Sequence, residues 1–133
     1  KLSRTEGFGP EVKRRILLGT FVLSSGYYDA YYGKAQKARR LVMDKTNAIF
    51  EDYDFILSPT TPHPAFDINE EVSDPTKMYL EDIFTVHANI TGVPSISLPV
   101  FKHSSKLPFG IQFSAPSFKD AELLSFARNM INN

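Results

Sequence analysis

The stretch Ser-Ile-Ser-Leu-Pro-Val-Phe-Lys-His-Ser-Ser-Lys-Leu-Pro-Phe-Gly-Ile-Gln-Phe-Ser, residues 95–114, decides the fold that this sequence predicts. Ser95–Val100 and Leu107–Ser114 each predict a β-strand. Ser104–Lys106 predicts a turn between them, because serine is a common turn former. The strands need helices against them to build a core.

Helices are predicted on both sides of these strands in the sequence. After Pro116 and Ser117 a last helix is expected, with Asp120 and Glu122 favourably placed near its positive end. Before the strands, Tyr79–Ile90 has apolar residues at helical spacing and is followed by Gly92, which is typical of a helix end.

The first half of the chain predicts two further helices and one strand. Pro10 suits the first turn of a short helix that continues to about Phe21. Tyr27–Tyr53 contains no proline and predicts a long amphipathic helix, ~40 Å if it is continuous. Asp54–Ser58 predicts a short buried strand, and the proline-rich stretch that follows predicts a long irregular loop as far as Pro75.

The predicted order of elements gives an α/β fold, with helices packed on a small mixed β-sheet. Residues 1–133 are expected to form a single globular unit. Three strands are few for this number of helices, because sheet edges and faces would be left uncovered. The sequence therefore predicts a piece of a larger fold.

Composition narrows the class of protein. The 133 residues are 42% hydrophobic, 13% aromatic and 23% charged, as in soluble globular proteins. The formal net charge is zero, which excludes a generally basic nucleic-acid binder. There is no cysteine, so disulfides, thiolate metal sites and cysteine nucleophiles are excluded. No stretch approaches the ~20 apolar residues of a membrane helix.

The sequence contains no motif that performs chemistry alone. No serine lies in a Gly-x-Ser-x-Gly motif or three residues before a lysine. The single histidines His63, His87 and His103 lack the spacing of metal ligands, and His87 is interpreted as a core histidine on an apolar helix face. The cluster Tyr27–Tyr32 could stack on single-stranded nucleic acid, but without a basic excess we interpret its rings as packing residues.

Several runs carry a resemblance to a known family. The stretch Glu6–Tyr32, with Lys34–Arg39 after it, closely resembles the carboxyl-terminal part of the A subunits of glutamyl-tRNA(Gln) amidotransferases, a branch of the amidase signature family. The resemblance covers essentially the whole chain, through Leu57–Pro62, Met78–Thr85, Ala88–Pro94, Ser95–Pro99 and Leu107–Phe113. The first run is specific to this branch, whereas Ser58–Pro62 and Gly92–Pro94 are shared by many amidases.

The resemblance implies a cytoplasmic, glutamine-hydrolysing component of an enzyme complex, which releases ammonia from glutamine. The partner B and C subunits complete that complex: the B chain uses ATP and Mg to activate the glutamyl group of misacylated tRNA, and the small C chain supports the assembly. The family's Ser, cis-Ser, Lys triad lies in a glycine- and serine-rich segment that this sequence does not contain. We therefore expect no catalytic residue, metal or cofactor in this segment, and no activity of the segment alone.

Two substrate-binding residues follow from the resemblance. Arg15, the second arginine of Lys-Arg-Arg-Ile, matches the position that binds the α-carboxylate of glutamine, and Asp82, in Tyr-Leu-Glu-Asp, matches the one that binds the α-ammonium group. A planar guanidinium can bind a carboxylate through two hydrogen bonds, and a carboxylate can accept from an ammonium. The family commonly has proline where this sequence has His87. This difference does not remove either charged residue that would contact the substrate.

Alternatives remain open at this stage. The chain could belong to another amidase of the same family with a different substrate, or be a non-catalytic interaction domain. Glutamine and asparagine share the same zwitterionic end, so the residues do not separate them as ammonia donors, nor Glu-tRNA(Gln) from Asp-tRNA(Asn) as acceptors. We expect the isolated segment to self-associate through its uncovered apolar surface, and we expect no membrane partner.

Overall fold

The computed structural model describes residues 5–67 and 75–132. The chain divides into two compact units, Lys1–Leu41 and Val42–Asn133, and each is described by itself. The expectation of a single globular unit therefore stays a prediction.

The described part of the first unit is largely helical. α2 (Pro10–Val22) begins with a proline in its first turn, which confirms the predicted start. A π-helix, η1 (Tyr28–Gly33), follows. Its tyrosine rings pack on one another, with 5.9 Å between the ring centroids of Tyr27 and Tyr31 and 4.9 Å between those of Tyr28 and Tyr32. Tyr27, Tyr28 and Tyr31 are 39–58% exposed, so the interpretation of this cluster as packing residues stays a prediction.

The prediction of one continuous helix over Tyr27–Tyr53 is wrong in its extent. The chain forms η1 and then α3 (Lys34–Ile49), with the change at Gly33. Glycine is unfavourable inside an α-helix by about 1 kcal/mol, which weakens the α-helical hydrogen-bond pattern at this point and favours a change of helix type. α3 ends in turns rather than continuing, since the amide of Tyr53 still bonds to the carbonyl of Ile49 but the amide of Asp52 reaches back only three residues.

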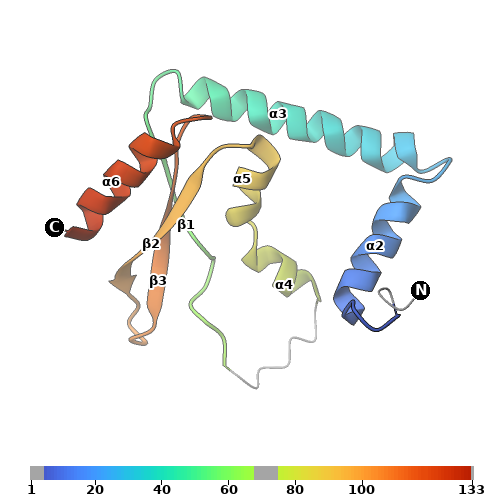
Figure 1. Ribbon diagram of the computed structural model, residues 1–133, viewed down its shortest axis with the longest axis horizontal. Helices are drawn as coiled ribbons and strands as arrows, with labels where there is room; N and C mark the ends of the chain where they lie inside the picture. The colour runs from blue at the N-terminus through green and yellow to red at the C-terminus, as the bar shows by residue number, and fades with distance from the viewer. Residues whose placement is uncertain (1–4, 68–74, 133) are drawn as a thin grey trace. The chain divides into compact units, whose positions relative to one another are not determined.

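A three-stranded sheet forms the centre of the second unit (Figure 1). Its order is β1-β3-β2, with β1 at Ile56–Pro59, β2 at Ser95–Lys102 and β3 at Pro108–Ser114. The α/β class with helices on a small sheet is confirmed, but the described strands pair antiparallel where a mixed sheet was expected. The reason is that β1 and β2, which run in the same direction, are both neighbours of β3 and not of each other.

The structure confirms the predicted turn between the last two strands, but the predicted strand before the proline-rich loop is not buried. The turn between β2 and β3 is confirmed: the amide of His103 donates to the carbonyl of Leu107 over 2.9 Å, and Lys106 takes a φ of 68°. β1 lies at the edge of the sheet and is not buried, since Leu57 is 61% exposed. β1 extends to Pro59. Proline has no backbone N–H, and an edge strand tolerates this because the outer side of the strand pairs with no neighbour.

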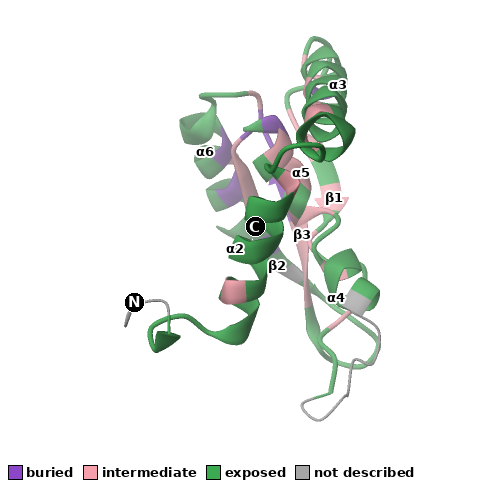
Figure 2. Cartoon of the chain, turned by 90° about the vertical axis from the view of Figure 1, so that its right-hand side faces the viewer, coloured by how far each residue is buried: buried purple, intermediate pink, exposed green. Residues whose placement is uncertain are grey.

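The two faces of the sheet differ in polarity. One face packs against α6 (Asp120–Asn132) and forms a core of Leu98, Phe113, Ala115, Leu123 and Ala127. Side chains alternate between faces along a strand, so the opposite face carries the intervening polar residues Ser95, Ser97, Gln112 and Ser114. Figures 1 and 2 show α6 on one side of the sheet and α5 on the other.

The predicted helix over Tyr79–Ile90 is two helices in the structure. α4 (Pro75–Glu81) and α5 (Thr85–Thr91) are separated by a short junction, Asp82–Phe84. The Thr85 hydroxyl donates to the carbonyl of Asp82 over 3.1 Å, and such back-bonding often bends helices. The predicted end is confirmed, because Gly92 takes the left-handed conformation with a φ of 76°.

Much apolar surface is exposed in both units. Examples are Leu17 at 70%, Leu41 at 60%, Leu57 at 61% and Phe118 at 95%. Among the described residues, no helix is both long enough and apolar enough to span a membrane. The exposed side chains therefore form the kind of surface that other polypeptide normally covers.

Candidate functional site

Arg15 lies on α2 and already binds a carboxylate. Its Nε donates to Glu11 Oε1 over 2.9 Å, one turn earlier on the helix. Arg14 binds the other oxygen of the same carboxylate, with 2.7 Å between Nη2 and Glu11 Oε2. The hydrogen bonds from Arg15 and Arg14 lower the pKa of Glu11 below its ordinary value. Both guanidinium groups are therefore exposed, charged and able to bind carboxylate oxygens.

Asp82 lies in the junction between α4 and α5, and its side chain is on the surface. Its backbone is held from both sides. The amide of Asp82 donates to the carbonyl of Tyr79 over 3.3 Å, while its carbonyl accepts from the amide of Val86 over 2.9 Å. The position of this carboxylate therefore depends on how the junction is fixed.

Sequence reasoning missed the contacts that fix the junction. Gln112, in the middle of β3, donates from its side-chain amide to the carbonyl of Phe84 over 3.2 Å. His63 Nδ1 donates to Glu81 Oε1 over 2.9 Å and so connects the proline-rich loop with the end of α4. No sequence motif predicts these hydrogen bonds, because each joins residues that are far apart in the sequence.

His87 makes structural contacts but lies outside the buried core cluster in which the sequence interpretation placed it. It lies on α5, half-buried, with its Nε2 in a 2.9 Å hydrogen bond with Oγ1 of Thr46 on α3, a residue that is only 3% exposed. The Thr91 hydroxyl donates to the carbonyl of His87 over 2.8 Å. His87 is therefore a structural residue that joins α5 to the carboxyl-terminal part of α3.

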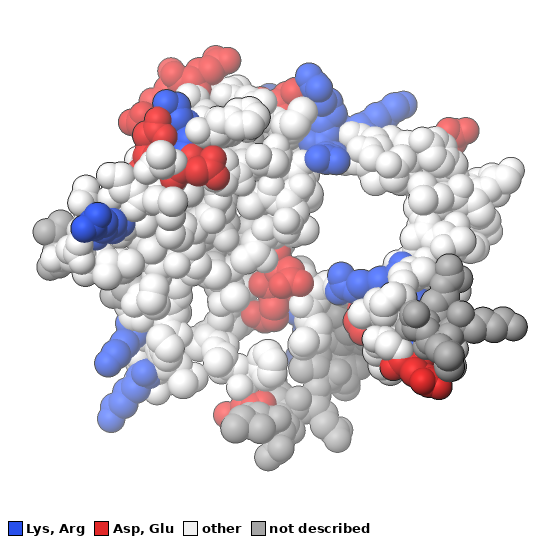
Figure 3. All heavy atoms as spheres, viewed as in Figure 1, with Lys and Arg blue, Asp and Glu red and all other residues white. Residues whose placement is uncertain are grey.

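Arg15 and Asp82 belong to different compact units. Each environment is described by itself, and the joint binding of one ligand by these residues stays a prediction. Within the described ranges, no group of three or more His, Cys, Asp or Glu residues could hold a metal ion. On the face seen in Figure 3, basic and acidic side chains both occur and neither dominates the surface.

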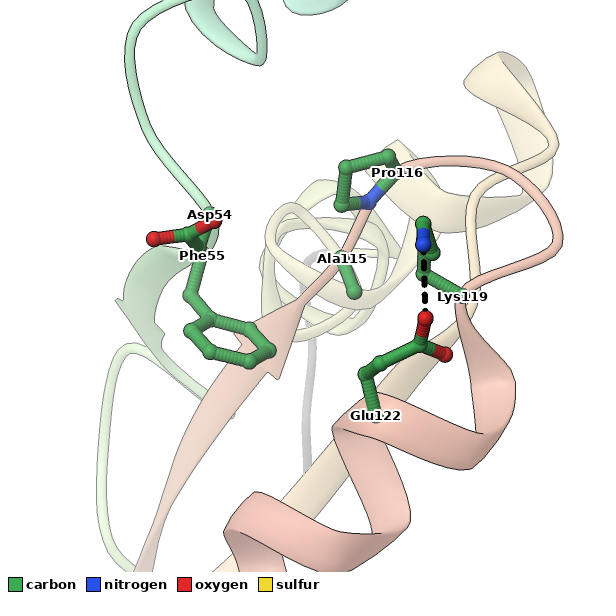
Figure 4. Close-up of a pocket in the computed structure, with 6 residues that line it drawn as sticks. All are labelled: Asp54, Phe55, Ala115, Pro116, Lys119 and Glu122. Atoms are coloured by element: carbon green, nitrogen blue, oxygen red, sulfur yellow. Dashed lines mark hydrogen bonds and ion pairs between the residues drawn. The ribbon is translucent and has the colours of Figure 1, made fainter.

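The second unit also contains a cavity of about 260 Å³ at the start of α6, lined by residues just before β1 and just after β3. Phe55 stands on one side and the Lys119–Glu122 pair on the other, with Ala115 and Pro116 between them (Figure 4). Lys119 Nζ lies 2.6 Å from Glu122 Oε1, and this hydrogen bond raises the pKa of Lys119 and lowers that of Glu122. Lys119 and Glu122 form an ion pair with each other across one helical turn. We therefore interpret this pair as a structural feature and not as a binding site.

Comparisons with known proteins agree with the resemblance in the sequence. The profile of the family described as Amidase matches residues 1–124. The A subunit of glutamyl-tRNA(Gln) amidotransferase from Brevibacillus brevis is 55% identical over 127 residues, which are 96% of this chain and 26% of the relative. Its counterpart from Staphylococcus carnosus is 53% identical over 127 residues, with the same coverage of both chains.

A solved structure gives the same result for the fold. The crystal structure of the A subunit of glutamyl-tRNA(Gln) amidotransferase from Thermotoga maritima matches with a TM-score of 0.75 and 47% identity, over 98% of this chain and 28% of that one. The chain thus spans about a quarter of the length of the relatives that it matches. The resemblance to these A subunits is confirmed, and the chain belongs to the amidase family.

Proposed function

We propose that this chain is the carboxyl-terminal part of the glutamine-hydrolysing subunit of an aminoacyl-tRNA amidotransferase. The complete enzyme supplies ammonia from glutamine to convert Glu-tRNA(Gln) into Gln-tRNA(Gln). The single observation that carries this proposal is the 55% identity with an amidotransferase A subunit along 96% of the chain. The run from Glu6 to Tyr32 carries the resemblance to that branch in the sequence.

In this proposal the chain contributes recognition of glutamine. Arg15 binds the α-carboxylate through its guanidinium, which is exposed on the surface of α2. Asp82 accepts from the α-ammonium group. A substrate that lacks either charged group loses one of these two contacts, so we expect simple amides to bind more weakly than glutamine.

The rest of the reaction depends on parts outside this chain. The nucleophile, its lysine and the oxyanion donors come from the glycine- and serine-rich segment of the full-length protein. The partner B chain uses ATP and Mg on the misacylated tRNA, and the partner C chain supports the cytoplasmic complex. The segment alone is expected to have no glutaminase activity, since it contributes recognition but no nucleophile.

The test is the tRNA-dependent reaction of the complete protein together with its partner chains. We expect amidation of Glu-tRNA(Gln) that requires both glutamine and ATP, and weak hydrolysis of simple amides. If simple amides are hydrolysed as well as glutamine or better, and tRNA is not amidated, the proposal fails. The chain would then belong to another amidase of the family. Absence of both activities in the complete assembly would favour a non-catalytic interaction domain.

A further inference from the structure

The strongest unassigned feature is a buried polar side chain that reaches out of the central strand. Gln112 is only 5% exposed, although glutamine is usually a surface residue. Its register partners on the two neighbouring strands are Ser58 and Ser97, both small. Small neighbours leave room for a long side chain to rise from this face of the sheet toward the helices.

The target of Gln112 is a backbone atom of the junction that carries Asp82. The amide nitrogen of Gln112 donates to the carbonyl oxygen of Phe84 over 3.2 Å. Phe84 is the N-cap residue of α5, and its side chain makes no capping hydrogen bond. The bond to Gln112 therefore connects the start of α5 directly to the sheet, two residues after Asp82.

Further contacts make the junction a defined structure. Val86 and Thr85 both donate to the carbonyl of Asp82, over 2.9 and 3.1 Å. The His87–Thr46 hydrogen bond ties α5 to α3 on the other side. These bonds fix the shape of the junction and its link to α3, while Gln112 fixes its position relative to the sheet.

We propose that Gln112 is a positioning residue that holds Asp82 where it can accept from the α-ammonium group of glutamine. The inference rests on the proposed function. A binding group must be held within a fraction of an ångström of its productive position. A neutral amide suits this task, because it can be buried in the sheet without the cost of burying a charge.

The test uses the complete protein with its partner chains and two substrates. The first is glutamine, and the second is glutaramate, which is glutamine without its α-ammonium group. Gln112→Met keeps the length of the side chain but loses the donor. We expect it to raise KM for glutamine roughly tenfold with a smaller change in kcat, and to leave kcat/KM for glutaramate unchanged.

Ser114→Ala is the matched control. Ser114 lies two residues further along the same strand on the same face, is 2% exposed and bonds to Ser95 rather than to the junction. This variant loses a buried hydrogen bond of the sheet, so we expect lower stability with the glutamine KM unchanged. If Gln112→Met fails to fold, Gln112→Asn carries the test, since it keeps the amide but is one methylene too short to reach Phe84.

A second comparison separates positioning from a general structural role. In an Asp82→Asn background, the Gln112 variants should cause no further rise in the glutamine KM, because the group that they position has lost its charge. Equal losses with glutamine and glutaramate, or fully additive effects with Asp82→Asn, would overturn the inference. If Asp82→Asn itself leaves the glutamine KM unchanged, the proposed role of Asp82 fails first. If Asp82→Asn raises KM and the Gln112 variants do not, only the inference fails.

Discussion

Gly110 on β3 lies close to side chains of two neighbouring segments. A Cβ atom at this position would lie 2.5 Å from the hydroxyl of Ser97 and 2.7 Å from that of Thr60. These two hydroxyls already bond to each other over 2.6 Å, and the amide of Thr60 donates to the carbonyl of Gly110 over 3.0 Å. The φ of Gly110 lies outside the left-handed region, so the obstacle to a larger residue is steric.

Gly110→Ala is therefore expected to destabilise the chain. Adding a methyl group where it would meet two side-chain hydroxyls below 3.0 Å costs about 1–3 kcal/mol. If the two hydroxyls are displaced, the hydrogen bond between them is lost, which costs a further ~1 kcal/mol. The smaller conformational entropy of alanine in the unfolded chain offsets about 0.4–1 kcal/mol. We expect a net loss of about 1–3 kcal/mol in the free energy of unfolding, from the difference of these terms.

The assay is urea-induced unfolding of the 133-residue chain, followed by circular dichroism at one fixed protein concentration. Ser97→Ala removes the nearest oxygen, so the double variant Gly110→Ala/Ser97→Ala should lose less than the sum of the single losses. A change below about 0.5 kcal/mol for Gly110→Ala would refute the steric reasoning, because such a value is ordinary for surface positions. Strict additivity in the double variant would refute the assignment of the clash to Ser97.

Two further predictions concern charge and apolar surface. The pKa of Glu122 is lowered by its bond with Lys119, so its contribution to stability should be complete above its ordinary value of 4.5 and be lost as the pH falls below it. Comparing urea unfolding of the wild type and Glu122→Gln should thus show a stability difference at pH 7 that shrinks as the pH is lowered below 4.5, and a difference independent of pH would contradict it. The exposed leucines and Phe118 predict that the isolated segment self-associates, and a monomer at high concentration in light scattering would count against this.

Local patterns predicted most helices and strands of this chain. Pro10 correctly indicated the start of α2, and Gly92 the end of α5. Where tertiary contacts decide the local structure, the sequence pattern was insufficient. The apolar spacing of Tyr79–Ile90 gives no sign of a break, because the junction depends on the Thr85 back-bond and on the bond from Gln112 on a distant strand.

The candidate site was predictable only in part. Arg15 and Asp82 came from a resemblance to relatives, since an exposed arginine and an exposed aspartate are common on any surface. Gln112 could not be found by the same reasoning, because a glutamine in a strand has no motif until its partner at Phe84 is known. The apolar helix face indicated a packed His87, but the residue is only half-buried, and its partner Thr46 could not be predicted from the sequence.

The most direct test of the account is the role of Arg15 in the complete protein. Arg15→Ala is compared with Arg14→Ala, which removes a neighbouring guanidinium that binds the same Glu11 carboxylate. The substrates are glutamine and 4-aminobutanamide, which is glutamine without its α-carboxylate. The account predicts that Arg15→Ala lowers kcat/KM for glutamine by about tenfold or more, leaves 4-aminobutanamide unaffected, and that Arg14→Ala changes neither. Unchanged glutamine kinetics in Arg15→Ala, or an equal loss in both variants, would contradict it.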